Sequence, residues 1–156
     1  LHARTGVRPR LLPLPIDSRL SKIEADAMVV IGDRAMQIPA SDYHQVWDLG
    51  EEWNRETGLP FVFAMWVALE EQPDSLELAA ALRFARDEGL ANLQTIIDHE
   101  AVKYGLAAED CRRYFVQQLH FTLGDQELAG LELFRSKAAS LGLIPEKSTQ
   151  LTLIPL

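Results

Sequence analysis

Residues 25–36 read ADAMVVIGDRAM, and this stretch decides the predicted fold. Within it, residues 27–31 are apolar without any alternation, which is typical of a strand that is buried on both faces in a parallel sheet. Gly32 and Asp33 end the run abruptly. Asp33 also stands where it can cap the turn formed by residues 34–36.

Strand-like and helix-like segments alternate on both sides of this stretch. Three further runs have the character of strands: residues 10–16, 43–48 and 61–68. Two short helices are expected, one capped by Asp17 and Ser18 and running to about Glu24, the other over residues 49–57 and ended by Gly58. This alternation predicts an α/β sheet with crossover helices.

The second half of the chain predicts helices. Ser75 is expected to cap a long helix that Gly105 ends, with Gly89 as the point where it bends or divides. Two more helices are expected over residues 108–119 and 126–141, followed by an extended segment at 151–154.

The helical half needs a sheet against which to bury its apolar stripes. All the predicted strands precede residue 70, and the chain starts like a helix end that Gly6 closes. We therefore expect this sequence to be the C-terminal part of a larger α/β protein.

Composition restricts the class of protein. The 156 residues are 47% hydrophobic and 24% charged, as in globular proteins, and the net charge of −8 argues against a nucleic-acid partner. The longest apolar run, residues 59–69, is too short to span a membrane, and no signal-peptide layout is present. The single cysteine, Cys111, is expected to be a packing residue, which is consistent with a reducing cytoplasm.

Gly32 and Asp33 are the strongest candidates for a site. Ligands of open α/β sheets collect at the carboxyl ends of strands, and glycine lets a ligand approach the backbone closely. The alternative is that Asp33 only caps a helix and Gly32 only makes the turn.

The other polar residues give no recognisable catalytic or metal motif. The four histidines do not have the spacing of metal ligands: His2, His44, His99 and His120. Nucleotide-binding, nucleophile and paired-cysteine motifs are absent as well, so no cofactor is expected. Glu51 and Glu52 are expected to solvate their helix rather than act as an acid–base pair. The three tryptophans are expected to be core or interface anchors: Trp47, Trp53 and Trp66.

Residues 25–36, together with DLGEEWNRETGLPFVFAMWVA at 48–68, resemble the chorismate dehydratases. These are cofactor-free lyases of the futalosine route to menaquinone. The stretch at 57–64 distinguishes them from the related 1,4-dihydroxy-6-naphthoate synthases. The resemblance implies a type II periplasmic-binding-protein-like fold with two α/β lobes, and loss of water from chorismate, an anionic small molecule, in the cleft between the lobes.

The resemblance also implies which residues line the cleft and how the lobes divide. Gly32, Asp33, Pro60, Phe61 and Val62 are the expected substrate-binding residues, and Asp33 is the expected catalytic residue, orienting or protonating the departing hydroxyl. Residues 1–58 are assigned to the remainder of the second lobe. Residues 59–156 are assigned to a crossover strand and to helices that return to the first lobe.

Part of the expected machinery has no match in this sequence. The family uses an N-terminal asparagine and a serine/threonine-rich loop for substrate binding and proton removal, so the missing N-terminal segment is needed to complete the cleft and the fragment alone is expected to be inactive. Two alternatives stay open: a non-enzymatic solute-binding protein of the same fold, and a scaffold or partner-binding module.

Overall fold

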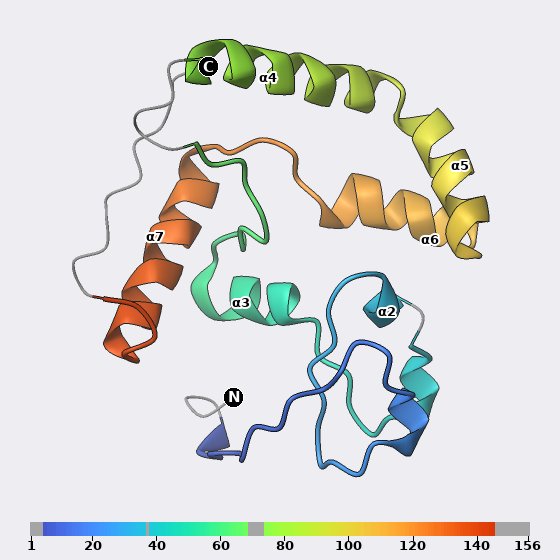
Figure 1. Cartoon of the computed structure of the whole chain (residues 1–156), viewed down its shortest axis with the longest axis vertical. Coiled ribbons are helices and arrows are strands. Elements are labelled where there is room, and N and C mark those ends of the chain that lie inside the picture. Colours follow the sequence, from blue (N-terminus) through green and yellow to red (C-terminus); the bar gives the residue numbers. More distant parts are fainter. Residues whose placement is uncertain (1–4, 37, 69–73, 146–156) are drawn as a thin grey trace. The chain divides into compact units, whose positions relative to one another are not determined.

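The computed structural model describes residues 5–36, 38–68 and 74–145. The chain divides into two compact units, Leu1–Val46 and Trp47–Leu156. Every regular element within the described residues is a helix, as Figure 1 shows. The predicted assignment of residues 1–58 and 59–156 to different lobes stays a prediction.

The first unit consists of short helices joined by irregular segments. They are η1 (Leu20–Lys22), α2 (Asp33–Met36) and η2 (Ala40–Asp42). The guanidinium of Arg34 donates to the backbone carbonyls of Ile16 and Ser18, and this fastens α2 to the segment that precedes η1. The helix predicted after Asp17 corresponds to η1, which is only one turn long. Neither Asp17 nor Ser18 caps it, because the N-cap residue is Arg19.

None of the predicted strands is present among the described residues, so the structure does not confirm the predicted α/β sheet. All four segments, residues 10–16, 27–31, 43–48 and 61–68, are irregular. A strand is held by hydrogen bonds to a neighbouring strand. Neither unit contains a neighbouring strand among its described residues. The apolar side chains of these segments are correspondingly exposed, as at Ile31 (82%) and Trp66 (82%).

The second unit begins with α3 (Leu49–Thr57), whose predicted limits are confirmed. The Asp48 carboxylate accepts hydrogen bonds from the backbone N–H groups of Gly50 at 2.8 Å and Glu51 at 3.1 Å. Two of the N–H groups that a helix start leaves without partners are satisfied in this way. Gly58, with φ of 70°, ends the helix in the left-handed conformation.

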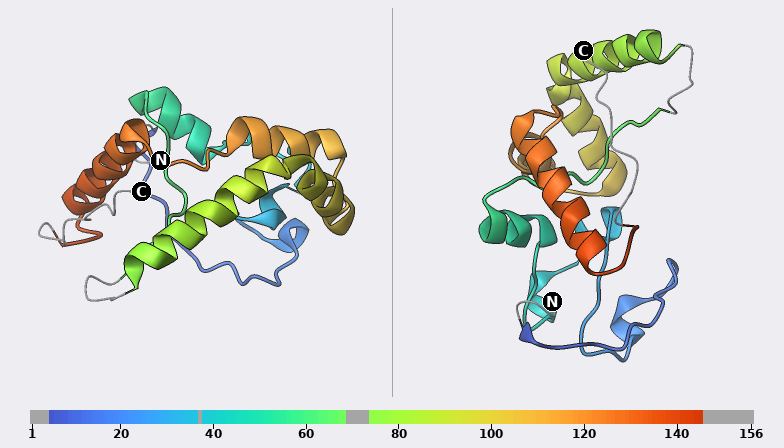
Figure 2. Two further views of the ribbon diagram at one scale, coloured as in Figure 1. Left: turned by 90° about the horizontal axis from the view of Figure 1, so that it is seen from above. Right: turned by 90° about the vertical axis from the view of Figure 1, so that its left-hand side faces the viewer.

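The predicted long helix is two helices, α4 (Ser75–Ala91) and α5 (Leu93–Tyr104), whose axes differ in direction in Figure 2. The break lies at Asn92, not at Gly89. The Asn92 N–H makes the last helical hydrogen bond to the Glu88 carbonyl, and the Asn92 side-chain amide donates to the same carbonyl, a local side-chain bond of the kind that competes with helix continuation. Asp74, not Ser75, occupies the N-cap position of α4.

The last helices follow the predicted limits closely. Helix α6 (Ala108–Arg113) continues into a π-helical turn, η3 (Tyr114–Gln118), and α7 spans Asp125–Ser140. The π turn was not expected from the sequence. The segment expected to be extended at 151–154 lies outside the described residues.

A small core joins α5 to α6. The most buried side chain is Ile97, which is 1% exposed, and it packs with Ala101 and with Cys111, which is 2% exposed. Leu93 and Phe115 cover this cluster. The predicted packing role of Cys111 is confirmed.

Candidate functional site

The first group of predicted site residues lies at the start of α2. Gly32 has φ of +68°, and its carbonyl accepts a hydrogen bond from the Ala35 N–H at 2.9 Å. A Cβ at this position would meet nothing within 4 Å, so the left-handed backbone, not crowding, accounts for glycine here. Asp33 is the first residue of the helix that follows.

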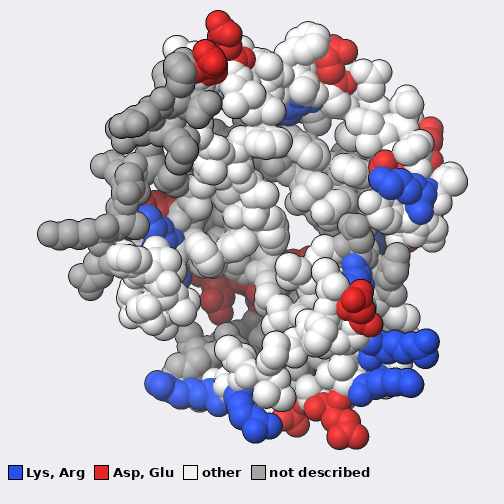
Figure 3. Space-filling view, in the orientation of Figure 1, with Lys and Arg blue, Asp and Glu red and all other residues white. Residues whose placement is uncertain are grey.

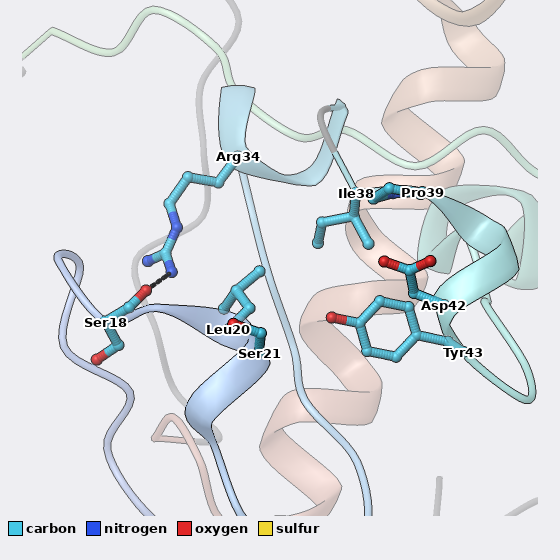
Figure 4. Close-up of a pocket in the computed structure, with 8 residues that line it drawn as sticks. All are labelled: Ser18, Leu20, Ser21, Arg34, Ile38, Pro39, Asp42 and Tyr43. Carbon is cyan, nitrogen blue, oxygen red and sulfur yellow. Dashed lines mark hydrogen bonds between the residues drawn. The ribbon is translucent and has the colours of Figure 1, made fainter.

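A hollow of about 300 Å³ lies in the same unit and includes Arg34 of α2 (Figure 4). Its lining is a mixture of polar and apolar side chains: Ser18, Leu20, Ser21, Arg34, Ile38, Pro39, Asp42 and Tyr43. Figure 4 shows Arg34 beside Ser18 on one side, with Asp42 and Tyr43 on the other. Both terminal nitrogens of the Arg34 guanidinium already donate to backbone carbonyls, so the Asp42 carboxylate and the hydroxyl groups are the polar groups that the hollow offers.

The second group of predicted site residues, Pro60, Phe61 and Val62, lies in the other unit, directly after α3. The Phe61 ring is the centre of an aromatic cluster, with centroids 5.6 Å from Trp53, 4.9 Å from Phe63 and 5.1 Å from Phe134. All three contacts are edge-to-face, the geometry that aromatic quadrupoles favour. These contacts hold the half-buried Phe61 ring in place.

Two glycines, one in α3 and one in α7, allow this segment to pack closely against both helices. A Cβ built on Gly130 would lie 2.2 Å from the Pro60 carbonyl oxygen, and one built on Gly50 would lie 2.6 Å from Cζ of Phe63. The sequence analysis missed both residues. A glycine inside a helix destabilises the helix by about 1 kcal/mol relative to alanine. A glycine within a predicted helix is therefore a sign that another part of the chain packs closely against it, and this was the signal that the sequence offered.

Trp53 is half-buried and packs in the aromatic cluster, as expected of a core or interface anchor. Its ring packs against Phe61 and Phe134, at 5.6 and 5.9 Å between centroids. The indole Nε1 is buried and has no hydrogen-bond partner within the described residues. Its ring planes meet those of both phenylalanines at about 70°, an arrangement in which a ring edge can approach a π face.

The described ion pairs involve side chains that are exposed or only partly buried. His120 Nδ1 and Glu127 Oε1 share a hydrogen bond of 2.8 Å, and the other oxygen of Glu127 accepts from the Gly124 N–H at 2.9 Å. The His120 hydrogen bond, followed by the backbone hydrogen bonds, holds the pKa of Glu127 below its usual range. His99 is 72% exposed in its side chain and pairs with Glu100, which confirms its predicted surface position.

The remaining charged groups of the described residues are spread out on the surface or joined in local pairs. No cluster of three potential metal ligands occurs among the residues that the structure describes. Glu52 pairs with Arg55 on α3. Figure 3 shows acidic and basic side chains interspersed among uncharged ones on the face displayed.

No helix within the described ranges is both long and apolar enough to cross a bilayer.

Comparison with known proteins shows the family to which the chain belongs. Residues 1–140 match the family described as "Menaquinone biosynthesis", so the chain belongs to this family. Among its individual relatives, it is 32% identical over 134 residues to the chorismate dehydratase of Thermus thermophilus, covering 76% of this chain and 48% of that protein. The predicted resemblance to the chorismate dehydratases is confirmed.

Two further relatives extend the comparison. The chorismate dehydratase of Campylobacter jejuni is 26% identical over 121 residues, covering 78% of this chain and 53% of that protein. The 1,4-dihydroxy-6-naphthoate synthase of Streptomyces coelicolor is 26% identical over 128 residues, covering 78% and 45%. The chain thus spans about half the length of the curated relatives it matches. No solved structure is significantly similar to it.

Proposed function

We propose that the complete gene product containing this chain is a chorismate dehydratase, a hydro-lyase that converts chorismate to 3-enolpyruvylbenzoate and water in the futalosine route to menaquinone. The observation that carries the proposal is the family match over residues 1–140 together with the 32% identity to a chorismate dehydratase. Sequence features specific to the dehydratases, at residues 57–64, support this reaction over that of the naphthoate synthases.

The reaction needs positioning and proton transfer. A base removes the ring hydrogen beside the enol ether, the C–H electron pair becomes part of the ring π system, and the neighbouring C–O bond breaks. The hydroxyl group leaves as water after it takes up a proton, and the aromatic ring that forms provides the driving force. An enzyme for this step must orient a dianion and supply one base and one acid.

We propose that Gly32, Asp33, Pro60, Phe61 and Val62 belong to the substrate cleft of a two-lobed, type II periplasmic-binding-protein-like fold. In this proposal Asp33 orients or protonates the departing hydroxyl. In this proposal the contacts of Phe61 with Trp53 and Phe134 hold the segment of Pro60, Phe61 and Val62 in position at the cleft.

The exposed apolar segments support an α/β fold completed by further polypeptide. Val29 and Ile31 are 70% and 82% exposed, and Trp66 and Val67 are 82% and 70% exposed. Runs of this composition are typical of strands covered on both faces. We propose that an N-terminal segment supplies the neighbouring strands and the main proton-transfer residues, and that residues 1–156 alone are inactive.

The proposed enzyme is cytoplasmic and acts on a small anionic molecule, without a nucleic-acid or membrane partner. The net charge of −8 supports the exclusion of nucleic acid, because phosphate neutralisation requires clustered Lys and Arg.

The direct test incubates the complete gene product with chorismate and follows the loss of its diene absorbance, with the product identified by mass spectrometry. We expect a product with the mass of chorismate less one water. A solute-binding protein would instead bind chorismate and release it unchanged, and that result would overturn the proposal.

The role of Asp33 has its own test. Asp33→Asn is compared with Asp26→Asn, the same chemical change at an exposed position of the same unit. We expect the Asp33 variant to lose turnover and the Asp26 variant to keep it. Equal turnover of the two variants would remove Asp33 from the mechanism and leave the dehydratase proposal standing.

A further inference from the structure

We infer that Gly130 of α7 is a positioning residue that sets where the backbone of Pro60, Phe61 and Val62 stands. This inference rests on the proposed function, in which that segment contacts the substrate. It adds a residue far along the chain to the determinants of substrate binding.

The contact between Gly130 and Pro60 is the closest that any described glycine makes with backbone. A Cβ on Gly130 would lie 2.2 Å from the Pro60 carbonyl oxygen, 3.4 Å from its carbonyl carbon and 3.7 Å from Cβ of Leu59. Gly130 is itself buried. One of its Hα atoms therefore points toward the Pro60 oxygen, as in a weak Cα–H···O contact.

A methyl group at Gly130 must displace backbone, because no flexible side-chain end is there to yield. Carbon and carbonyl oxygen in such contacts stay about 3.3 Å apart, so alanine requires a relative shift of about 1 Å. Because proline fixes φ at position 60, the carbonyl can turn aside mainly by rotation about ψ, and that rotation also moves the peptide group of Phe61. The shift is therefore shared between α7 and the segment that starts at Pro60.

The segment is also held along its length, so it cannot simply slide away. Phe134 lies one helical turn after Gly130, on the same face of α7, and its ring contacts that of Phe61 at 5.1 Å. On the α3 side, the tip of the Phe63 ring already fills the space that a Cβ on Gly50 would need. Displacing Pro60 thus moves Phe61 and Val62 with it.

Gly89 provides a matched control. It also lies inside a helix, α4, but a Cβ there would meet nothing within 4 Å. Glycine-to-alanine substitution raises helix propensity by the same amount at both positions. Any difference between the two variants therefore reports the contact with Pro60.

The test compares Gly130→Ala with Gly89→Ala in the complete gene product, with chorismate as substrate. A misplacement of about 1 Å can cost about 100-fold in rate, so we expect kcat/KM of the Gly130 variant to fall by roughly 10- to 100-fold with a raised KM. Gly89→Ala should match the wild type. A merely structural role would reduce the amount of active enzyme, and hence kcat, but leave KM unchanged.

Phe134→Leu keeps the test decisive if Gly130→Ala does not fold. It removes the edge-to-face contact with Phe61 without adding volume, and we expect a several-fold rise in KM. Kinetic constants of either folded variant equal to those of Gly89→Ala would overturn the positioning role while wild-type turnover upholds the proposed function. Absence of wild-type turnover would remove the proposed function, and the positioning role with it.

Discussion

Truncating Ile97 to alanine should loosen the α5–α6 core more than any comparable change on the same helix. Ile97 is 1% exposed and packs with Ala101 and Cys111. The substitution removes three buried carbons, worth about 2.4 kcal/mol in transfer free energy at 0.8 kcal/mol per methylene. The cavity left behind raises the expected loss to about 3 kcal/mol, after the few tenths that alanine returns in helix propensity.

Val102→Ala is the matched control, because it truncates a β-branched side chain on the same helix at a position that is 84% exposed. We expect its effect on the free energy of unfolding to stay within about 0.5 kcal/mol. Hydrogen exchange of the Leu93–Tyr104 amides in the complete gene product measures both variants. A loss of 3 kcal/mol corresponds to exchange roughly 100-fold faster. Equal exchange in the two variants would refute the assignment of this cluster as the core of the second unit.

Three further predictions concern other parts of the second unit. Asp48→Ala should cost about 1 kcal/mol and Asp48→Asn much less, since only the latter keeps a cap acceptor; equal urea midpoints would contradict this. The folded-state pKa of Glu127 is lowered, so its stabilisation is present at neutral pH and lost as the pH falls from the ordinary glutamate range through the lowered value. Carboxyl NMR titration should show this pKa rising in His120→Gln, and an unchanged pKa would sink the assignment. Cys111, 2% exposed, should react with thiol reagents only after unfolding, and rapid labelling of the native protein would show that the helix pair is open.

The sequence predicted the helices well because their signals are local. Gly58 and Gly105 end α3 and α5 with φ of 70° and 65°, as their position after an amphipathic run indicated. The predicted break at Gly89 is wrong because low helix propensity alone does not break a helix, and α4 continues to Ala91. At Asn92, where α4 ends, the side-chain amide donates a second hydrogen bond to the Glu88 carbonyl.

The strands could not be predicted in the same way because pairing is not local. An apolar run such as residues 27–31 carries the composition of a buried strand, but its ladder depends on a neighbour elsewhere in the polypeptide. The described residues of this chain contain no such neighbour, and Ile31 is left 82% exposed.

The candidate site shows the same division between local and distant information. Of the two interpretations of Gly32, a site residue or only a turn, the turn is local, and the φ of +68° agrees with it; the site role stays a prediction. Phe61 was expected to contact substrate, yet its ring is held by Trp53 and Phe134, and Phe134 lies more than seventy residues away along the chain. The approach of Gly130 to Pro60 likewise depends on how α7 packs, which no local pattern encodes.

The central claim is that the complete protein removes water from chorismate, and one measurement tests it most directly. Purified gene product is incubated with chorismate, and the mixture is resolved by liquid chromatography and mass spectrometry. The account predicts the enzyme-dependent appearance of 3-enolpyruvylbenzoate in step with chorismate loss. Chorismate that is recovered intact, whether bound or free, would contradict it.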